Sequence, residues 1–217
     1  MTVNHHPSNE TLLHFAAGTL SAGPAVVIAA HLEQCELCRL RVVDFESIGG
    51  MVLDDMPPTR LATDAFARTL KRLDETTASS TEGPIIAEHH AAVGIPLPAV
   101  LRHCRVGRWR WLGPGFRWSK VTIPESPDAK VMLLKARAGL RLPAHGHTGM
   151  EYMQILSGSL HDDRGQYGPG DLDEADVNVE HQPVVDTQSE CVCLAALEGD
   201  TRLHGLFGRL LWPVVGF

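Results

Sequence analysis

Hydrophobic residues in the first third of the chain recur every three or four positions, which is the spacing of amphipathic helices. The pattern predicts a short helix over residues 10–17, ended by Gly18, and a second helix that begins after Ser21. A third helix is predicted from Glu36 to the residues before Pro57, since a proline cannot donate to the helical hydrogen-bond ladder.

A fourth helix is predicted over residues 61–73, where apolar side chains form one stripe. The stripe could belong to the core of a helical domain or form a face for a partner protein. We expect the core, because most amphipathic faces are buried within their own domain. The members of the stripe are Ala62, Phe66, Leu70 and Leu73.

The pattern changes twice beyond this helix. Residues 76–94 are rich in Thr, Ser, Gly and Pro and carry no apolar period, which is typical of a linker. Over residues 95–217, apolar and polar residues alternate in short runs broken by glycine and proline, as in an antiparallel barrel or jelly roll. We therefore predict a two-domain α + β protein, with about four helices over residues 1–75, a linker, and a β-barrel domain.

Composition narrows the functional classes. The net charge is −7 and no run of Lys or Arg is present, whereas a nucleic-acid-binding surface needs dense positive charge. The N-terminus has no basic and apolar signal segment, and no stretch approaches the length of a membrane span. We therefore expect a cytosolic protein that binds neither nucleic acid nor membranes. Five cysteines in such a compartment indicate metal ligands or free thiols rather than disulfides.

The helical region contains a strong metal-binding pattern, His31-x3-Cys35-x2-Cys38. His31 and Cys35 are one helical turn apart, and Cys38 can return to them through the first turn of the next helix. An imidazole and two thiolates suit tetrahedral zinc, which needs a fourth ligand, and His5 and His6 are both available from the N-terminal arm. The alternatives are free thiols at a helix bend or a redox pair, but a redox Cys-x2-Cys belongs to a strand-to-helix setting that this sequence lacks.

A second pattern lies in the predicted barrel. His145 and His147 are two residues apart, so both rings leave the same face of a strand, and Glu151 can join them from the next strand. Their spacing between Gly139 and Gly158 resembles the first sequence motif of the cupins, which implies a cupin barrel with a bound metal. Imidazoles and a carboxylate accept zinc, iron, manganese, nickel or cobalt.

The second cupin motif usually places a histidine shortly after a Pro-x-Gly turn. Here the Gly-Pro-Gly turn at 168–170 is followed by a longer run before His181, which departs from the motif, and His181 is the candidate fourth ligand. Cys191 and Cys193 alternate on a predicted strand and so share one face. They are candidate oxidisable thiols near the barrel metal, although free cysteine is more often a small buried hydrophobic residue.

The two halves together resemble the ChrR-like zinc-containing anti-sigma factors, and the resemblance covers nearly the whole chain. It rests on the N-terminal histidines, the His-x3-Cys-x2-Cys pattern, the cupin ligands and the Cys-x-Cys strand. The resemblance implies that the barrel metal is also zinc and that the barrel responds to oxidative stress such as singlet oxygen. It implies that the helical domain wraps an extracytoplasmic-function sigma factor and keeps it from core RNA polymerase. The implied zinc ligands of the helical domain are His6, His31, Cys35 and Cys38.

We therefore predict an anti-sigma factor rather than an enzyme, with no catalytic residues. The alternative is a metal-dependent cupin enzyme of the dioxygenase or isomerase type with a zinc-stabilised helical appendage, since an open coordination position would allow substrate chemistry. A metal-buffering protein is the weakest hypothesis, because closed sites of high affinity exchange metal poorly. No Ser-His-Asp or Cys-His nucleophilic motif supports another reaction class.

Overall fold

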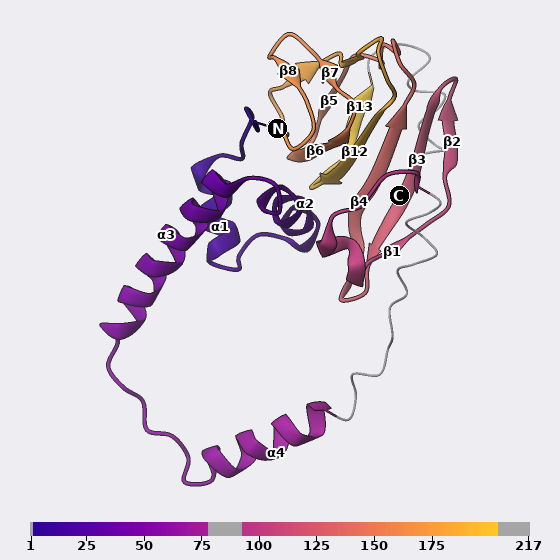
Figure 1. The fold of residues 1–217 in the computed structure, drawn as a ribbon. Helices are drawn as coiled ribbons and strands as arrows, with labels where there is room; N and C mark the ends of the chain where they lie inside the picture. The colour runs from indigo at the N-terminus through magenta and orange to yellow at the C-terminus, as the bar shows by residue number, and fades with distance from the viewer. Residues whose placement is uncertain (1, 78–92, 204–217) are drawn as a thin grey trace.

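The computed structural model describes residues 2–77 and 93–203, and it confirms the predicted fold class, with helices first and antiparallel strands after them (Figure 1). Residues 78–92 of the predicted linker lie outside the described residues, and the predicted domain boundaries stay a prediction. The described helices are α1 (Asn9–Ala16), α2 (Ala22–Leu32), α3 (Glu36–Asp54), α4 (Ala65–Thr77) and the short 3-10 helix η1 (Ala99–His103).

The helices begin and end where local chemistry directs them. The Ser8 side chain caps α1 by accepting a hydrogen bond from the backbone N–H of Thr11 at 3.2 Å, and Gly18, with a φ of 66°, follows its end. Ser21 precedes α2 without a capping bond, because its hydroxyl donates to the carboxylate of Glu198 instead. No helix within the described ranges is long and apolar enough to cross a membrane.

The described strands form one large sheet and two small ones, and all of their pairings are antiparallel. In the large sheet the order is β1-β3-β4-β12-β6-β9, with β2 paired to β3, and the small sheets are β10-β5-β13 and β11-β7-β8. The bounds are β1 (Arg105–Val106), β2 (Arg110–Gly113), β3 (Phe116–Ile123), β4 (Ser126–Ala136), β5 (His145–His147), β6 (Glu151–Ser157), β7 (Leu160–His161), β8 (Gln166–Tyr167), β9 (Leu172–Ala175), β10 (Glu180–His181), β11 (Val184–Val185), β12 (Cys191–Leu197) and β13 (Thr201–Leu203).

Alternation along the strands gives the large sheet two apolar faces. The inner face packs on side chains from the small sheets, in a cluster that includes Met132, Met153, Ile155, Leu160 and Val185. The outer face packs on the helices, in a cluster that includes Val27, Ile28, Val131, Leu133, Leu194 and Ala196. We call the three sheets together the barrel.

Helix α2 lies against the outer face of the large sheet, beside β4, β6 and β12 (Figure 1). None of its residues is exposed, and Val27 and Ile28 are fully buried. Gly23 allows the close approach, because a Cβ at this position would lie 3.3 Å from Val131 Cγ2. α2 is apolar on all sides because the sheet covers one side and α1 and α3 contact the helix elsewhere.

A polar contact holds the end of α2 to the barrel as well. The Glu33 carboxylate accepts hydrogen bonds from the backbone N–H groups of Ala99 at 2.8 Å and Val100 at 2.7 Å, and so caps η1. The first three helices and the barrel therefore share one hydrophobic core, joined by hydrogen bonds at its rim.

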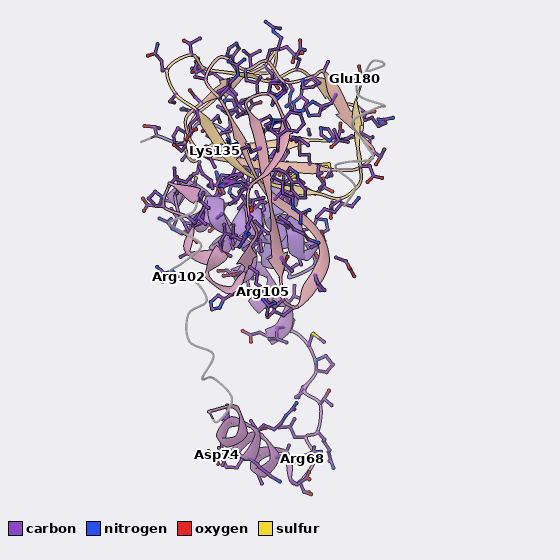
Figure 2. All side chains as sticks on the ribbon, turned by 90° about the vertical axis from the view of Figure 1, so that its right-hand side faces the viewer. Arg68, Asp74, Arg102, Arg105, Lys135 and Glu180 are labelled. Carbon is purple, nitrogen blue, oxygen red and sulfur yellow. The ribbon has the colours of Figure 1, made fainter. Side chains whose placement is uncertain are left out.

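The end of α3 and all of α4 lie outside this shared core. Figures 1 and 2 both show α4, which carries Arg68 and Asp74, standing apart from the barrel. Between residues 46 and 74 every residue except Ala65 is exposed. The stripe predicted as core was wrong: Phe66 is 76%, Leu70 46% and Leu73 60% exposed. Periodicity identifies an apolar face, but it does not say whether another element of the same chain covers that face.

Candidate metal centres

The four predicted ligands of the helical region come together in one cluster, which we call the helical centre. One ligand atom from each of His6, His31, Cys35 and Cys38 lies within 4.8 Å of the others. His6 Nδ1 lies 3.3 Å from Cys35 Sγ and 3.4 Å from Cys38 Sγ, and His31 Nε2 lies 3.3 Å from Cys38 Sγ. Two thiols and two imidazoles facing one point could hold a metal ion, and this donor set suits zinc in a tetrahedral arrangement.

Local structure and the barrel position these ligands together. His31 lies in the last turn of α2, and Cys35 is the N-cap of α3, where its Sγ accepts the backbone N–H of Cys38 at 3.5 Å. His31 Nδ1 lies 2.9 Å from the carbonyl oxygen of Gly170, to which it donates when Nε2 faces a metal. One ligand of the helical centre is therefore oriented by the turn between β8 and β9 of the barrel.

The N-terminal arm brings His6, and not His5, to the cluster. The His5 ring stacks on Tyr167, with 4.3 Å between the ring centroids. The arm is held by Asp171, whose Oδ1 accepts the backbone N–H of Asn4 at 2.6 Å and of His5 at 2.9 Å. His5 also accepts a backbone hydrogen bond from Leu172 at 3.1 Å. These bonds leave the next side chain, His6, directed at the two thiols.

The electrostatics of the helical centre fit a cation. Burial lowers the pKa of His31 to about 4, so the ring is neutral and has a free lone pair for a metal. Burial and a hydrogen bond with Cys35 raise the pKa of Cys38 to about 12, because neighbouring sulfurs and an apolar setting oppose a bare thiolate. A divalent cation would reverse this preference, since it compensates the charge of both thiolates.

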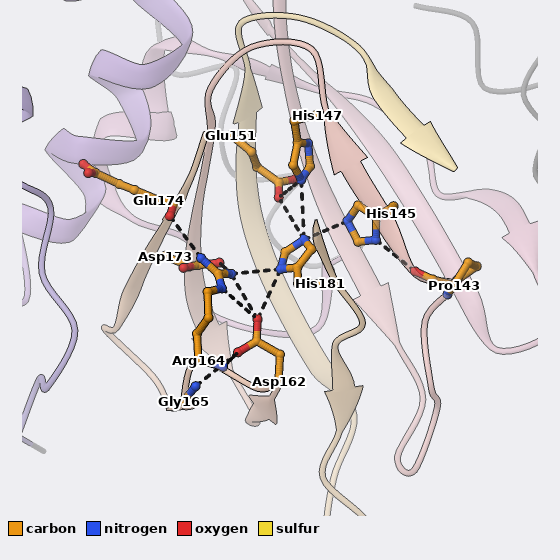
Figure 3. Close-up of polar contacts among 10 residues, drawn as sticks. All are labelled: Pro143, His145, His147, Glu151, Asp162, Arg164, Gly165, Asp173, Glu174 and His181. Atoms are coloured by element: carbon orange, nitrogen blue, oxygen red, sulfur yellow. Dashed lines mark hydrogen bonds and ion pairs between the residues drawn. The ribbon is translucent and has the colours of Figure 1, made fainter. Parts of the chain in front are cut away.

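The barrel ligands predicted from the second pattern also converge, and we call their cluster the barrel centre (Figure 3). His181 Nε2 lies 3.0 Å from His145 Nε2 and 3.4 Å from His147 Nε2. Glu151 Oε2 lies 3.2 Å from His147 Nε2 and 3.8 Å from His181 Nε2. Sequence spacing left His181 uncertain, and its position is explained by the pairing of β10 with β5, which sets His181 directly opposite His145.

The glycines of the cupin-like pattern have clear structural reasons. Gly139 and Gly158 have φ values of 67° and 74°, which side chains disfavour. A Cβ at Gly158 would lie 2.1 Å from the carbonyl oxygen of Glu190, and one at Gly149 would lie 2.0 Å from that of Glu198. The turns on both sides of the ligands therefore require glycine to bring β5 and β6 to their places.

Hydrogen bonds among the four ligand side chains cannot satisfy all of the polar atoms of the barrel centre. Burial and the neighbouring imidazoles lower the pKa of His147 to about 4, and burial with Arg164 lowers the pKa of His181. Burial and the charge of Asp173 raise the pKa of Glu151 to about 8. Three imidazoles that point Nε2 atoms at one another cannot all be paired through hydrogen, whereas a divalent cation accepts a lone pair from each and compensates the carboxylate.

An outer group of charged residues supports His181, and sequence reasoning missed it. His181 Nδ1 lies 3.2 Å from Asp162 Oδ2 and 2.9 Å from Arg164 Nη2, and Arg164 Nη2 also contacts Asp162 at 3.0 Å and Asp173 at 2.6 Å (Figure 3). The side chain of Asp162 is only 1% exposed, yet hydrogen bonds from Arg164 hold its pKa below the usual value. In the sequence Asp-Asp-Arg-Gly reads as an exposed hairpin turn, so no local signal distinguishes these residues.

Cys191 and Cys193 lie on the inner face of the barrel, with 3.6 Å between their sulfur atoms. They are 1% and 4% exposed. A hydrogen bond with Cys191, burial and the nearby Glu151 raise the pKa of Cys193 well above its ordinary value. Because the thiolate is the reactive form of cysteine, this setting favours packing over direct oxidation.

Among the described residues, a cleft reaches the barrel centre from the side of His181. His145 is the partly exposed ligand, while His147, Glu151 and His181 are buried. Beside His181 and Asp162 a cleft of about 480 Å³ opens, lined by polar side chains that include Arg141, His161 and Glu180. A small solute could therefore approach the barrel centre without opening the apolar core.

Comparison with known proteins gives three concordant results. Residues 98–199 match the family described as the ChrR cupin-like domain. Anti-sigma-E factor ChrR of Cereibacter sphaeroides is 33% identical to this chain over 216 residues, which are 98% of each protein. In structure, the chain is similar to one from the crystal structure of Rhodobacter sphaeroides SigE in complex with the anti-sigma ChrR. That match has 32% identity and a TM-score of 0.69, and covers 91% of this chain and all of the other.

Proposed function

Because this chain belongs to the ChrR family of anti-sigma factors, we propose that it binds an extracytoplasmic-function sigma factor and keeps it from RNA polymerase. We further propose that it does so in the cytoplasm, where such a partner acts. The observation that supports the proposal most directly is the exposed apolar surface of the end of α3 and of α4. A regulatory role also agrees with the relatives, which favour it over the alternative of a cupin enzyme.

The proposed docking surface, residues 46–74, is defined by exposed large apolar side chains. A surface of this kind would be unfavourable in water and marks a site of protein interaction. On α4, three of them follow the i, i+4, i+7 spacing of a helix that lies in an apolar groove of its partner. The members are Ile48, Met51, Val52, Leu53, Met56, Leu61, Phe66, Leu70 and Leu73.

The charge of the same region supports a partner with basic surfaces. Residues 1–80 carry ten acidic and six basic side chains, which gives a net charge of −4. This balance opposes direct contact with DNA and favours contact with a protein that itself binds DNA or polymerase through positive charge.

Co-purification with the sigma factor tests this surface. The double variant Phe66→Glu with Leu70→Glu should weaken binding about 100-fold or more, because it places two charges where apolar anchors enter a groove. The matched control, Ala67→Glu with Lys71→Gln, makes the same net charge change on another face of α4. If the control and the apolar variant bind equally well, the proposed surface is wrong, and failure of the wild-type chain to bind would refute the anti-sigma function.

We propose that zinc occupies the helical centre and that a second divalent metal, zinc in the first instance, occupies the barrel centre. In the helical centre His6, Cys35 and Cys38 with His31 would hold the arm to α2 and α3. In the barrel centre a bound cation would form a reactive metal site within reach of small solutes. His145 is the most exposed of its ligands.

We also propose that the barrel centre makes release of the sigma factor responsive to oxidative stress of the singlet-oxygen type. The purified complex, illuminated with a singlet-oxygen-generating dye, should dissociate for the wild type. With Glu151→Gln, which replaces a barrel ligand by an amide of the same shape, illumination should release no more sigma factor than darkness does. Glu190→Gln is the matched control, since Glu190 is exposed and pairs with Lys135 on the surface. Dissociation of the Glu151→Gln complex at the wild-type rate would contradict a sensing role for the barrel centre.

A further inference from the structure

We infer that residues 170–173, which are the end of the turn before β9 and the first two residues of that strand, couple the two metal centres, so that metal held in the barrel centre strengthens metal binding in the helical centre. The inference rests on the proposal that both centres hold metal. It adds a structural connection through which the two centres affect each other. It depends on short contacts at both ends of one stretch of four residues.

At its first end the stretch supports the helical centre. The Gly170 carbonyl oxygen lies 2.9 Å from His31 Nδ1. Asp171, which is only 3% exposed, receives the backbone N–H groups of the arm that carries His6. Two of the four ligands are therefore oriented by consecutive residues of the barrel, although one comes from α2 and the other from the N-terminus.

At its other end the stretch supports the barrel centre. Asp173, which is 7% exposed, pairs with Arg164 at 2.6 Å. Arg164 in turn holds Asp162, and Asp162 lies 3.2 Å from the Nδ1 atom of His181. When His181 binds a cation through Nε2, its Nδ1 carries the proton and donates a hydrogen bond to Asp162. His181, the carboxylates of Asp162 and Asp173 and the guanidinium of Arg164 then form one hydrogen-bonded unit.

The stretch between these ends is rigid enough to transmit a displacement. Gly170 donates to the Ile155 carbonyl at 2.9 Å, Ile155 donates to the Asp171 carbonyl at 3.0 Å, and Leu172 is buried in the shared core. A shift of Asp173 therefore moves the backbone that carries the Gly170 carbonyl and Asp171, because buried and paired groups do not rearrange independently.

Loss of the barrel metal leaves His181 without its orienting charge, and the Asp162–Arg164–Asp173 unit loses one of its partners. The expected result is a looser β9 and a weaker grip on His31 and on the arm. Coupling between two binding sites is reciprocal, so an occupied helical centre strengthens the barrel centre by the same factor. An oxidant acting on the barrel thereby weakens the helical region that holds the sigma factor.

Cobalt titration of the free, full-length protein under reducing conditions tests the coupling. Absorption from thiolate-to-cobalt charge transfer reports the helical centre alone, since the barrel centre has no sulfur ligand. Glu151→Gln, which impairs the barrel centre, should weaken cobalt binding at the helical centre about five- to tenfold. Asp173→Asn should do the same, and the two changes together should weaken it no further than either alone. Asp176→Asn, an equal charge change at a partly exposed carboxylate just beyond the end of β9 and outside both centres, should leave the affinity unchanged.

Arg164→Lys is a second way to break the link if Asp173→Asn does not fold, because lysine keeps the charge but cannot hold Asp162 and Asp173 with one planar fork. It should give the same five- to tenfold loss. Helical-centre affinities that stay within twofold of the wild type in Glu151→Gln would overturn the coupling. The titration contains no sigma factor, so this result is independent of whether the proposed anti-sigma function holds.

Discussion

The helical centre and the barrel centre assemble four ligands in opposite ways. The helical centre takes its ligands from residues 6–38, at the ends of two helices and on an arm, and two of them are thiols. The barrel centre takes nitrogen and oxygen ligands from β5, β6 and β10, whose positions depend on strand pairing.

The difference shows where each centre obtains its selectivity and strength. Two thiolates bind zinc strongly even from chain segments that have little structure of their own, so metal binding and local folding are one event. Nitrogen and oxygen ligands are less selective and depend on fixed orientation, which Asp162 and Arg164 provide for His181. Metal binding at the helical centre would therefore help to fold the segments around it. At the barrel centre, paired strands and charged neighbours orient the ligands for the metal.

Removing the thiols should have the largest effect. Cys35→Ser with Cys38→Ser should abolish binding of one metal equivalent and unfold the arm, α1 and the start of α3, because structural zinc in small domains contributes about 10 kcal/mol or more of apparent binding free energy. Mass spectrometry of the native protein and hydrogen exchange of these segments measure both effects. The control, Cys104→Ser, changes a half-buried thiol outside both centres and should retain both metals. Retention of both equivalents by the double variant would contradict the ligand assignment.

Removing the outer support of His181 should have the next largest effect, and mainly at the barrel centre. Asp162→Asn should weaken metal binding at the barrel centre about 10- to 100-fold, because the amide no longer accepts the His181 proton as a charged group does. Competition with a chromogenic chelator gives the affinity. Asp163→Asn, at the exposed neighbouring position, is the control. An unchanged affinity in Asp162→Asn would show that the charged partner of His181 does not strengthen metal binding at the barrel centre.

A smaller effect is expected from a change at Gly170, in the stretch that connects the two centres. Gly170 has a φ of 93°, and a Cβ there would lie 2.9 Å from Val3 Cγ2 and 3.1 Å from Gln34 Oε1. Gly170→Ala should therefore lower the free energy of unfolding by about 1–3 kcal/mol and push the arm away from the helical centre. Thermal unfolding and the rate of zinc release measure this. At Gly168 a Cβ would meet nothing closer than 3.9 Å, so Gly168→Ala should leave zinc release unchanged.

The smallest effect on either centre is expected from the paired cysteines of β12. Cys191→Ala with Cys193→Ala should leave both metal equivalents and the oxidant response intact, because the two thiols are buried and the raised pKa of Cys193 leaves little thiolate. Loss of the sulfur atoms should cost about 1 kcal/mol of stability per site. Response to singlet oxygen, measured as release of the sigma factor, checks the prediction, and an abolished response would make the pair the sensor.

Spacing within the sequence was enough to find features that depend on local geometry. His31 and Cys35 share one helical face, His145 and His147 share one strand face, and both pairs lie in their clusters. The same holds for Gly158, whose turn leaves no room for a side chain. Each of these relations spans a few residues, and backbone periodicity determines it.

Relations between distant segments could not be predicted in this way. Asp162 and Asp173 look like ordinary surface acids until strand pairing places Arg164 between them. The packing of α2 on the large sheet depends on contacts across more than one hundred residues, which no local pattern records. Phe66 and its neighbours show the same limit, since an apolar stripe does not reveal whether its cover lies in the same chain.

The exposed stretch from residue 46 to residue 74 has a consequence for the lifetime of the protein. A protease needs a segment that opens locally, and helices without a covering layer open at low cost. Molecules without a sigma factor should therefore be cut first in this stretch, whereas bound molecules are shielded. Degradation would then match the amount of inhibitor to the amount of its target without any further regulator, and brief trypsin treatment at Arg60 and Arg68 with and without the partner measures the difference.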